Sequence, residues 1–316
     1  MIRIKNLFQN RAAADAQGRL SQADGLLLFT VLFWGVNFSV VKFALAEIPP
    51  IVFNGIRFSV AAGTMLILAR ATRHAFRFER RHLPYLIGLG ILGNTSYQLF
   101  FVFGIANTTA DNSSLILATV PVWVALFGTL AGVERVTGRG WLGVGLSLAG
   151  IILIILGSDR GLQLHFGGAT LLGDGLVLLA TLCWSTYTLA TRPMMRRYSP
   201  VAVTSFSTLM GAIPLMLLSA PFMLRLDWNG VPANAWAALV LSGIFGIALA
   251  YFFWNNGVSR LGSTRTSLYS NLVPAVALLT AWLWLGETLT AQQWWGGLLA
   301  LAGVALARRY TFPVSG

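Results

Sequence analysis

The chain alternates between long apolar runs and short polar gaps from residue 24 almost to its end. Each run has about 20 residues, the length that a helix needs to cross the hydrocarbon core of a membrane. Backbone groups inside hydrocarbon must bond within their own segment, so these runs predict helices and not strands. The predicted spans cover residues 24–46, 50–70, 83–105, 110–131, 139–157, 171–191, 200–220, 235–258, 264–285 and 290–308.

The composition fits a chain that lies mostly in a membrane. Of its 316 residues, 56% are hydrophobic and only 10% are charged, whereas about a quarter of the residues of a soluble protein are charged. The apolar excess extends over the whole length, so one globular core cannot absorb it. We therefore predict an all-α integral membrane protein that has the lipid bilayer as its surroundings.

The positive charges indicate how the chain is oriented. The net charge is +12, but most Lys and Arg residues lie in the gaps between apolar runs, which is typical of membrane topology signals. Nucleic acid is therefore not an expected partner. With a cytoplasmic N-terminus, the inside segments hold 18 Lys and Arg residues and the outside segments two, while Lys42 and Arg57 fall within spans. This bias predicts ten helices with both termini cytoplasmic, in the plasma membrane (the inner membrane of a bacterium).

Two stretches of the chain repeat at nearly constant offsets. ADGLLLFTVLFWGV at 23–36 aligns with GDGLVLLATLCWST at 173–186, 150 residues later, and 120–151 aligns with 273–304 at an offset of 153. Because five spans are an odd number, the second five-helix half is inverted relative to the first, which is an architecture of transporters. The predicted segments are a cytoplasmic tail (1–22), a first repeat (23–157), an extracytoplasmic connection (158–170), a second repeat (171–308) and a cytoplasmic tail (309–316).

Several motifs, taken in order, resemble one family. They are the Trp-Gly pair of the first span, the Arg57-Phe58 pair of the second, the prolines Pro121 and Pro274, and the endings GVERVT and LGETLT. In this set, over about residues 24–308, the chain resembles the EamA family of the drug/metabolite transporter superfamily, and within it is similar to YddG-type amino-acid exporters. The first ending lacks the Gly-Glu pair of the second. The resemblance implies export of amino acids, aromatic and other neutral ones, or of related small metabolites, by alternating access.

Aromatic and amide side chains stand near the middle of several predicted spans. Trp34 and Asn37 lie one turn apart, as do Trp184 and Tyr187, so each pair shares a helix face. Polar side chains at this depth face the bundle interior or a water-filled cavity, although Asn, Gln and Ser also join helices by hydrogen bonds of about 0.6 kcal/mol. The predicted substrate-binding residues of a central cavity are Trp34, Asn37, Asn94, Tyr97, Gln98, Trp184, Tyr187, Tyr251, Asn255, Ser270 and Asn271.

Three further residues inside the spans have two interpretations each. Arg57 lies about 4–5 Å from the middle of its predicted helix, where a charge needs a partner. One interpretation is structural: an ion pair, with Asp111 and Glu47 as the candidates, or a contact with a carbonyl group or water. The other is a contact with the carboxylate of a substrate. Pro121 and Pro274 stand at repeat-equivalent positions and either bend at a gate or form static kinks.

The acidic residues limit the chemistry that we expect. All ten Asp and Glu residues lie in the tail, the gaps or the span ends, while proton-coupled transporters usually relay protons through intramembrane acids. We therefore expect no proton coupling and a neutral or zwitterionic small molecule as substrate. No metal-spaced cluster and no nucleotide-binding or metalloprotease motif is present, so we expect no metal, no cofactor and no enzyme. The alternatives are a drug or other-metabolite exporter of the same superfamily and a non-transporting receptor or scaffold.

The predicted spans 139–157 and 290–308 carry glycines at repeat-related positions and lack polar centres. Small residues let two helices approach closely inside a membrane. We interpret these spans as packing supports, with a dimer contact as the alternative, so the chain is expected to be a monomer or a homodimer.

Overall fold

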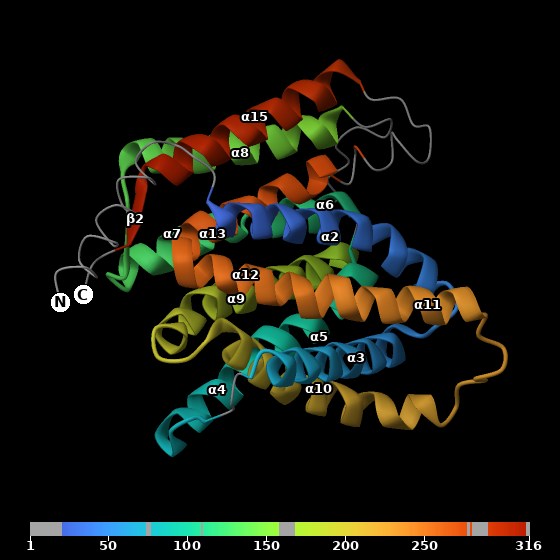
Figure 1. Cartoon of the computed structure of the whole chain (residues 1–316). Helices are drawn as coiled ribbons and strands as arrows, with labels where there is room; N and C mark the ends of the chain where they lie inside the picture. Colours follow the sequence, from blue (N-terminus) through green and yellow to red (C-terminus); the bar gives the residue numbers. More distant parts are fainter. Residues whose placement is uncertain are drawn as a thin grey trace.

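The computed structural model describes residues 21–73, 77–108, 110–157, 168–276, 279 and 290–313. The first half consists of α2 (Gln22–Leu45), α3 (Pro50–Ala71), η1 (Arg80–His82), α4 (Leu83–Gly90), the π-helix η2 (Ile91–Ser96), α5 (Tyr97–Ala106), α6 (Ala110–Ala118), α7 (Val120–Leu130), β1 (Glu134–Val136) and α8 (Gly138–Leu156). The second half consists of α9 (Gly168–Met195), α10 (Pro200–Met223), α11 (Ala233–Leu241), the π-helix η3 (Ser242–Leu249), α12 (Ala250–Leu261), α13 (Ser263–Ser267), the 3-10 helix η4 (Leu268–Leu272), α15 (Ala291–Arg309) and β2 (Thr311–Pro313). The helices form one elongated bundle (Figure 1).

Seven segments of the described chain are long and apolar enough to cross a membrane. They are Pro50–Ala71, Arg80–Ala106, Asn112–Leu130, Gly138–Leu156, Thr170–Met195, Pro200–Met223 and Ala233–Leu261, and each coincides with one predicted span. Helices α2 and α15 lie at the predicted spans 24–46 and 290–308 but are not among the seven, and much of the predicted span 264–285 lies outside the described residues. The count of ten and the side of the termini therefore stay predictions.

The two short strands mark one end of the bundle, which we call the β end. Strands β1 and β2 pair antiparallel, with Arg135 opposite Phe312. At the same end Arg308, in the last turn of α15, bonds to Asp24 in the first turn of α2. The chain thus brings the beginning of its first described helix and its last strand together (Figure 1).

The repeated threonine of the two motif endings begins a helix in each half. The Thr137 side chain accepts a hydrogen bond from the Gly140 amide at the start of α8, and the Thr290 side chain accepts one from the Gln293 amide at the start of α15. Such N-caps satisfy amide groups that have no partner inside the helix. The repetition of the motif therefore has a local structural cause.

The two halves are packed against each other in a repeated pattern. Glycines 153 residues apart make the contacts: Gly93 of η2 lies against the Tyr187 ring, and Gly246 of η3 lies against the Asn37 side chain. Their partners Tyr187 and Asn37 are 150 residues apart, which is the offset of the repeat. Each half thus contributes a π-helical segment that packs on the other half, and glycine permits the close approach.

Helices α8 and α15 form an antiparallel pair at one edge of the bundle (Figure 1). A Cβ atom at Gly150 would lie 2.6 Å from the carbonyl oxygen of Gly296, and one at Gly303 would lie 2.7 Å from that of Gly143. The glycines of the two spans therefore support packing within one chain, as their spacing predicted.

Alanine at Gly150 is expected to destabilise this pair. The added methyl group would lie 2.5 Å from the Ala300 amide nitrogen, so the helices must separate, and overpacking of this kind costs about 1–3 kcal/mol. Thermal unfolding in detergent checks this, with Gly145→Ala of the same helix as the control because nothing lies within 4 Å of a Cβ there. Equal unfolding temperatures for the two variants would refute the packing described here.

Candidate functional site

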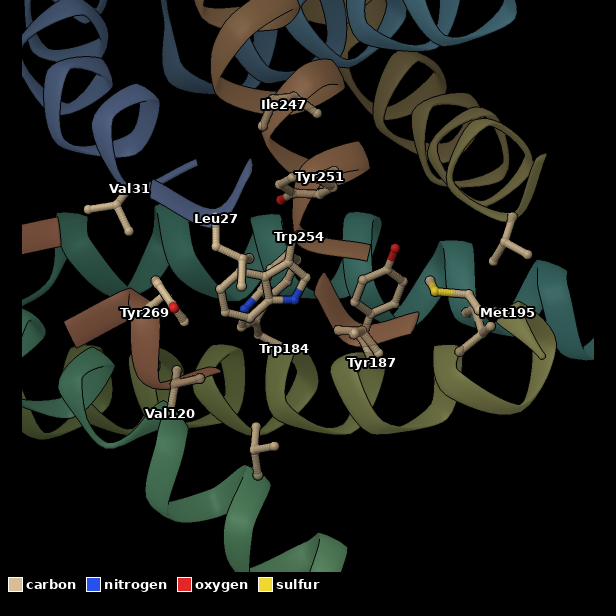
Figure 2. Packing of buried hydrophobic residues seen from close by; sticks show 14 of the residues in the cluster. Leu27, Val31, Val120, Trp184, Tyr187, Met195, Ile247, Tyr251, Trp254 and Tyr269 are labelled. Carbon is tan, nitrogen blue, oxygen red and sulfur yellow. The ribbon is translucent and has the colours of Figure 1, made fainter. Parts of the chain in front are cut away.

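Six aromatic side chains from four helices meet in the interior of the bundle. Trp184 lies at their centre, and its ring centroid is 4.9 to 5.8 Å from the ring centroids of the other five. Figure 2 shows Trp184 beside Trp254, with Tyr187 and Tyr251 near them. This aromatic cluster consists of Trp34 of α2, Tyr97 of α5, Trp184 and Tyr187 of α9, and Tyr251 and Trp254 of α12.

Helical spacing places these residues. Trp184 and Tyr187 are three residues apart on α9, as are Tyr251 and Trp254 on α12, and residues at this spacing lie on one helix face. These four side chains are at most 5% exposed. The sequence predicted five members of the cluster and missed Trp254, although its position three residues after Tyr251 is the same signal.

The indole groups at the edge of the cluster bond to the surrounding helices. The Trp34 Nε1–H donates to the carbonyl oxygen of Gly246 at 3.0 Å, which lies in the π-helix η3. The Trp254 Nε1–H donates to the Thr188 hydroxyl group at 3.2 Å. These bonds fix the orientation of two rings from opposite halves of the chain. π-helical segments inside α-helices are frequently found at functional sites.

Two of the predicted asparagines lie beside the cluster. The Asn255 amide donates to the Tyr187 hydroxyl group and to Thr204 Oγ1, both at 2.9 Å, and the Asn94 amide donates to the Ser207 carbonyl oxygen at 3.0 Å. The side-chain oxygens of both asparagines are buried without a hydrogen-bond partner among the described residues. Buried polar atoms normally have a partner, so such atoms call for an explanation.

The polar residues of α10 were not predicted as neighbours of the site. Thr204 and Ser207 lie on this helix, and the hydroxyl oxygens of Ser207 and Tyr187 are 3.5 Å apart. The stretch VTSFST of α10 carries a hydroxyl side chain at four of its six positions. That density of small polar residues inside an apolar run was the signal available in the sequence.

The predicted pair on the ninth span lies elsewhere. The Ser270 hydroxyl group donates to the carbonyl oxygen of Ser267, one turn earlier. The Asn271 amide donates to the Ser147 hydroxyl group of α8 at 2.9 Å. The described contact of Ser270 thus stays within one turn, that of Asn271 joins η4 to α8, and neither reaches the aromatic cluster.

Arg57 is buried next to the cluster and is 6% exposed. Its Nη2 lies 3.4 Å from Gln98 Oε1, its Nη1 lies 3.4 Å from Ser242 Oγ, and its Cζ lies 5.1 Å from the centroid of the Phe53 ring. No carboxylate forms an ion pair with Arg57 within the described part of the chain. Glu47, one of the two candidate carboxylates, lies exposed just after the end of α2 and forms no ion pair with Arg57 in the described structure. The side chain of Asp111, the other candidate, lies outside the described residues.

The two prolines at repeat-equivalent positions, Pro121 and Pro274, each lie next to an interruption of the α-helical backbone. Pro121 is the second residue of α7, directly after the break between α6 and α7 at Thr119. Pro274 follows the 3-10 helix η4. The structure thus has a break at each proline, and a role of these breaks in gating stays a prediction.

The open central cavity also stays a prediction. The rings of the aromatic cluster touch one another, and a groove of about 470 Å³ lies between α7 and α9 instead, lined by Phe127, Ala131, Val133, Thr186, Leu189, Ala190 and Pro193. This groove is lined mainly by apolar side chains and shares no residue with the cluster.

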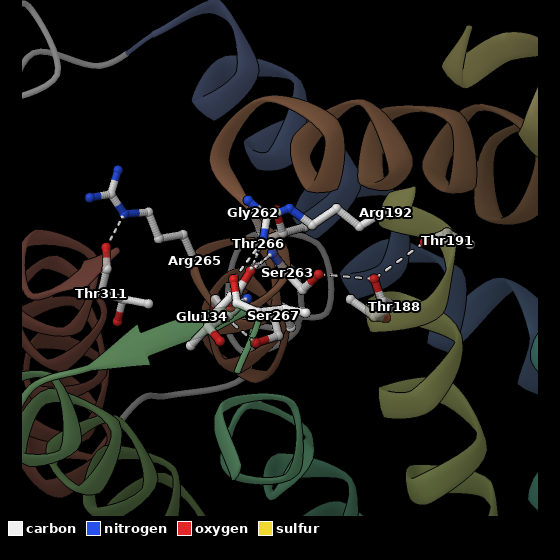
Figure 3. A network of polar contacts seen from close by, with 12 residues as sticks. Glu134, Thr188, Thr191, Arg192, Gly262, Ser263, Arg265, Thr266, Ser267 and Thr311 are labelled. Atoms are coloured by element: carbon white, nitrogen blue, oxygen red, sulfur yellow. Dashed lines mark hydrogen bonds and ion pairs between the residues drawn. The ribbon is translucent and has the colours of Figure 1, made fainter. Parts of the chain in front are cut away.

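A buried carboxylate connects β1 with α13 at the β end (Figure 3). The Glu134 carboxylate accepts hydrogen bonds from the backbone amides of Ser263 and Thr264 at 2.6 and 2.8 Å and lies 3.3 Å from Arg192 Nη1. A carboxylate at the first amides of a helix satisfies donors that have no partner inside it. Glu134 is the glutamate of the motif GVERVT, and its contacts explain why that motif contains an acid.

The same network reaches the aromatic cluster through hydrogen bonds. The Ser263 hydroxyl group donates to the Thr188 carbonyl oxygen at 3.1 Å, and the Thr188 hydroxyl group accepts the Trp254 indole N–H. Glu134, α13 and the cluster are thus linked by contacts between side chains and backbone. No local feature of the sequence indicates this connection, because Glu134 and Ser263 are 129 residues apart.

The fold and the motifs indicate a family, and a comparison with known families decides it. The sequence model of the EamA-like transporter family matches residues 22–156 and again residues 171–309. The chain belongs to the EamA-like transporter family. The double match confirms the two-repeat architecture, although it does not test the exact bounds predicted for the repeats. This EamA-like transporter is therefore a multi-pass membrane protein.

Known relatives support the assignment over nearly the whole length. The transporter is 30% identical over 295 residues to a probable terminal-alkyne amino-acid exporter of Streptantibioticus cattleyicolor, covering 93% of this chain and 95% of the relative. It is 28% identical over 300 residues to a probable amino-acid metabolite efflux pump of Escherichia coli, covering 90% and 94%. It also matches an uncharacterized transporter of Bacillus subtilis with 27% identity, covering 89% and 92%. A solved structure with 19% identity has the same fold, with a TM-score of 0.76, over 92% of this chain and 97% of that chain.

Proposed function

We propose that this transporter exports amino acids, aromatic and other neutral ones, by alternating access through the aromatic cluster and without proton coupling. The observation that carries the proposal is the cluster itself, which joins mid-helix side chains of both halves. Transporters built from inverted repeats bind their substrates near the midplane, at the interface between the repeats. The names of two relatives, which refer to amino-acid export and efflux, support the same substrate class.

The chemistry of the cluster suits an amino acid. Faces of Trp and Tyr rings attract cations such as an ammonium group, and they stack with aromatic side chains. The amides of Asn94 and Asn255 offer donors and acceptors at the border of the cluster. Trp34, Asn37, Tyr97, Gln98, Trp184, Tyr187 and Tyr251 complete the proposed binding residues, while Ser270 and Asn271 stand further out in this proposal.

Alternating access would open the cluster toward one side at a time. The rings are contributed by α2 and α5 of the first half and by α9 and α12 of the second, so relative rocking of the halves separates or joins them. Bending at Pro121 and Pro274 would allow the flanking helices to follow. The hydrogen bonds between the Glu134 carboxylate and the first amides of α13 would then have to be kept or broken as the β end closes or opens.

The proposed independence from a proton gradient rests on the position of the acids. Asp24 and Glu134 are buried at the β end, where each is paired with an arginine. Asp174, at the opposite end of the bundle, accepts hydrogen bonds from the Asn112 amide. The aromatic cluster contains no carboxylate, and proton relays in transporters use acids inside the membrane.

Release of amino acids from cells tests the direction of transport. Cells that express the protein are fed a phenylalanine dipeptide, which they hydrolyse inside, and phenylalanine is then measured in the medium. We expect faster release than from cells with an empty vector, and the excess should disappear with Trp184→Ala. Unchanged release of every amino acid tested, from cells that contain the folded protein, would favour a drug or other-metabolite exporter, or a receptor that carries no solute.

A further inference from the structure

Arg57 is a buried cation for which the described part of the chain supplies no anion. The Arg57 guanidinium group is 6% exposed, and its side chain forms no ion pair with any carboxylate of the described residues. Charges are rarely buried without an opposite charge, because the loss of hydration is not compensated. Ionisable residues inside membrane proteins accordingly mark functional sites.

The contacts that Arg57 does make are neutral and long. Its two hydrogen bonds, to the Gln98 amide oxygen and the Ser242 hydroxyl oxygen, are both 3.4 Å. Charge-assisted bonds from guanidinium to carboxylate are about 2.7–2.9 Å long. Its Nε–H has no partner among the described residues although the atom is buried. Guanidinium carries five N–H donors in a planar fork, and here much of that fork is unused.

Arg57 also borders the aromatic cluster. Its Cζ lies 5.8 Å from the centroid of the Phe58 ring, and that ring lies 6.4 Å from the Tyr251 ring of the cluster. A solute seated on the cluster therefore has a cation at its edge.

We propose that Arg57 binds the carboxylate group of the transported amino acid through its guanidinium fork, while the ammonium group and the side chain lie on the aromatic cluster. This inference rests on the proposed function and deepens it, because it makes a carboxylate a requirement for good substrates. Guanidinium recognises carboxylates by two parallel hydrogen bonds, which also fixes the orientation of the bound molecule.

The second half of the chain has no positively charged residue at the position equivalent to Arg57. The position equivalent to Arg57 in the second half, 150 residues later, is Ser207. Its neighbourhood contains the Tyr187 hydroxyl group and the amides of Asn94 and Asn255, which are uncharged. The site therefore offers one positive charge on one side of the cluster, and this matches one carboxylate better than a phosphate with two negative charges.

The test compares phenylalanine with phenylalaninamide, whose carboxylate is replaced by a neutral amide. Both compete for counterflow of labelled phenylalanine into proteoliposomes that contain the full-length protein. We expect the amide to compete at least about tenfold more weakly with the wild type, the loss typical of one charge-assisted contact. Arg57→Gln should weaken competition by phenylalanine by a similar factor and leave competition by phenylalaninamide nearly unchanged. Arg57→Lys should restore part of the preference for phenylalanine over its amide.

The outcomes separate this inference from the proposed function. Absence of phenylalanine counterflow in the folded wild type would overturn both. Counterflow by a wild type that accepts acid and amide equally would overturn only the role of Arg57, even if the Arg57 variants do not fold. If Arg57→Gln weakens competition by phenylalanine and by phenylalaninamide equally, the proposed role of Arg57 is also overturned. Asp111→Asn tests the structural alternative. If it weakens competition by phenylalanine as much as Arg57→Gln does, Arg57 forms an ion pair with Asp111 and does not bind the substrate.

Discussion

Alanine in place of Trp184 is expected to reduce amino-acid counterflow at least about tenfold. Trp184 contacts five other rings, and single aromatic contacts contribute about 0.5–1.5 kcal/mol beyond the area that they bury. Loss of one or two such contacts with the substrate corresponds to about a tenfold change in affinity. Initial rates at a range of phenylalanine concentrations measure the effect.

Two variants accompany this measurement. Trp295→Ala removes an indole that is 69% exposed on α15, and transport should stay close to the wild-type rate. Trp184→Phe keeps a ring at the centre of the cluster, so its transport rate should lie between those of Trp184→Ala and Trp295→Ala. Because large-to-small changes in a core cost about 3–5 kcal/mol of stability, unfolding temperatures must be compared as well. Wild-type transport by a folded Trp184→Ala protein would remove the cluster from the mechanism.

The second large effect is expected at the β end. Glu134→Ala should lower the free energy of unfolding by about 3–5 kcal/mol, because it removes one partner of a buried ion pair. The Glu134 and Arg192 side chains are 2% and 12% exposed, so water screens them little. The backbone amides of Ser263 and Thr264 also lose their acceptor. Unfolding curves in mixed micelles at increasing denaturing detergent measure the loss.

Glu79→Ala is the matched control for this prediction. Glu79 pairs with Arg81 at 2.6 Å, but the two side chains are 53% and 69% exposed. Exposed pairs contribute about 0–1 kcal/mol, so this variant should unfold almost like the wild type. If the two glutamate variants lose the same stability, Glu134 does not hold β1 and α13 together as the structure indicates.

The membrane-capable helices and most of the cluster could be predicted from the sequence. Apolar runs of sufficient length leave the backbone no alternative to a helix, and α3, α8 and α10 lie within three residues of their predicted ends. Trp34 and Trp184 stood out because an indole is rare at mid-span and because the repeat carries it twice. Helical spacing then selected Tyr187, and the same rule selected Tyr251 on α12.

What the sequence did not show depends on contacts between distant segments. The π-helices η2 and η3 insert extra residues into turns whose composition is ordinary for a membrane helix. Glu134 is 129 residues before Ser263, to whose amide it bonds. Asn271 has the polarity of a cavity residue, yet its described bond goes to Ser147 of α8, because an amide inside a membrane protein serves either purpose. Tertiary packing determines which partner each of these residues contacts, and the local sequence carries no signal for it.

Counterflow of labelled phenylalanine into proteoliposomes tests the central claim most directly. The vesicles hold unlabelled amino acid, the pH is equal on both sides, and a protonophore removes any residual gradient. The account predicts transient accumulation of the label with the wild type, and little with Trp184→Ala. Two results would contradict an uncoupled amino-acid transporter that works through the aromatic cluster. One is accumulation of the label only when a pH gradient is imposed, and the other is no accumulation with protein shown to be folded.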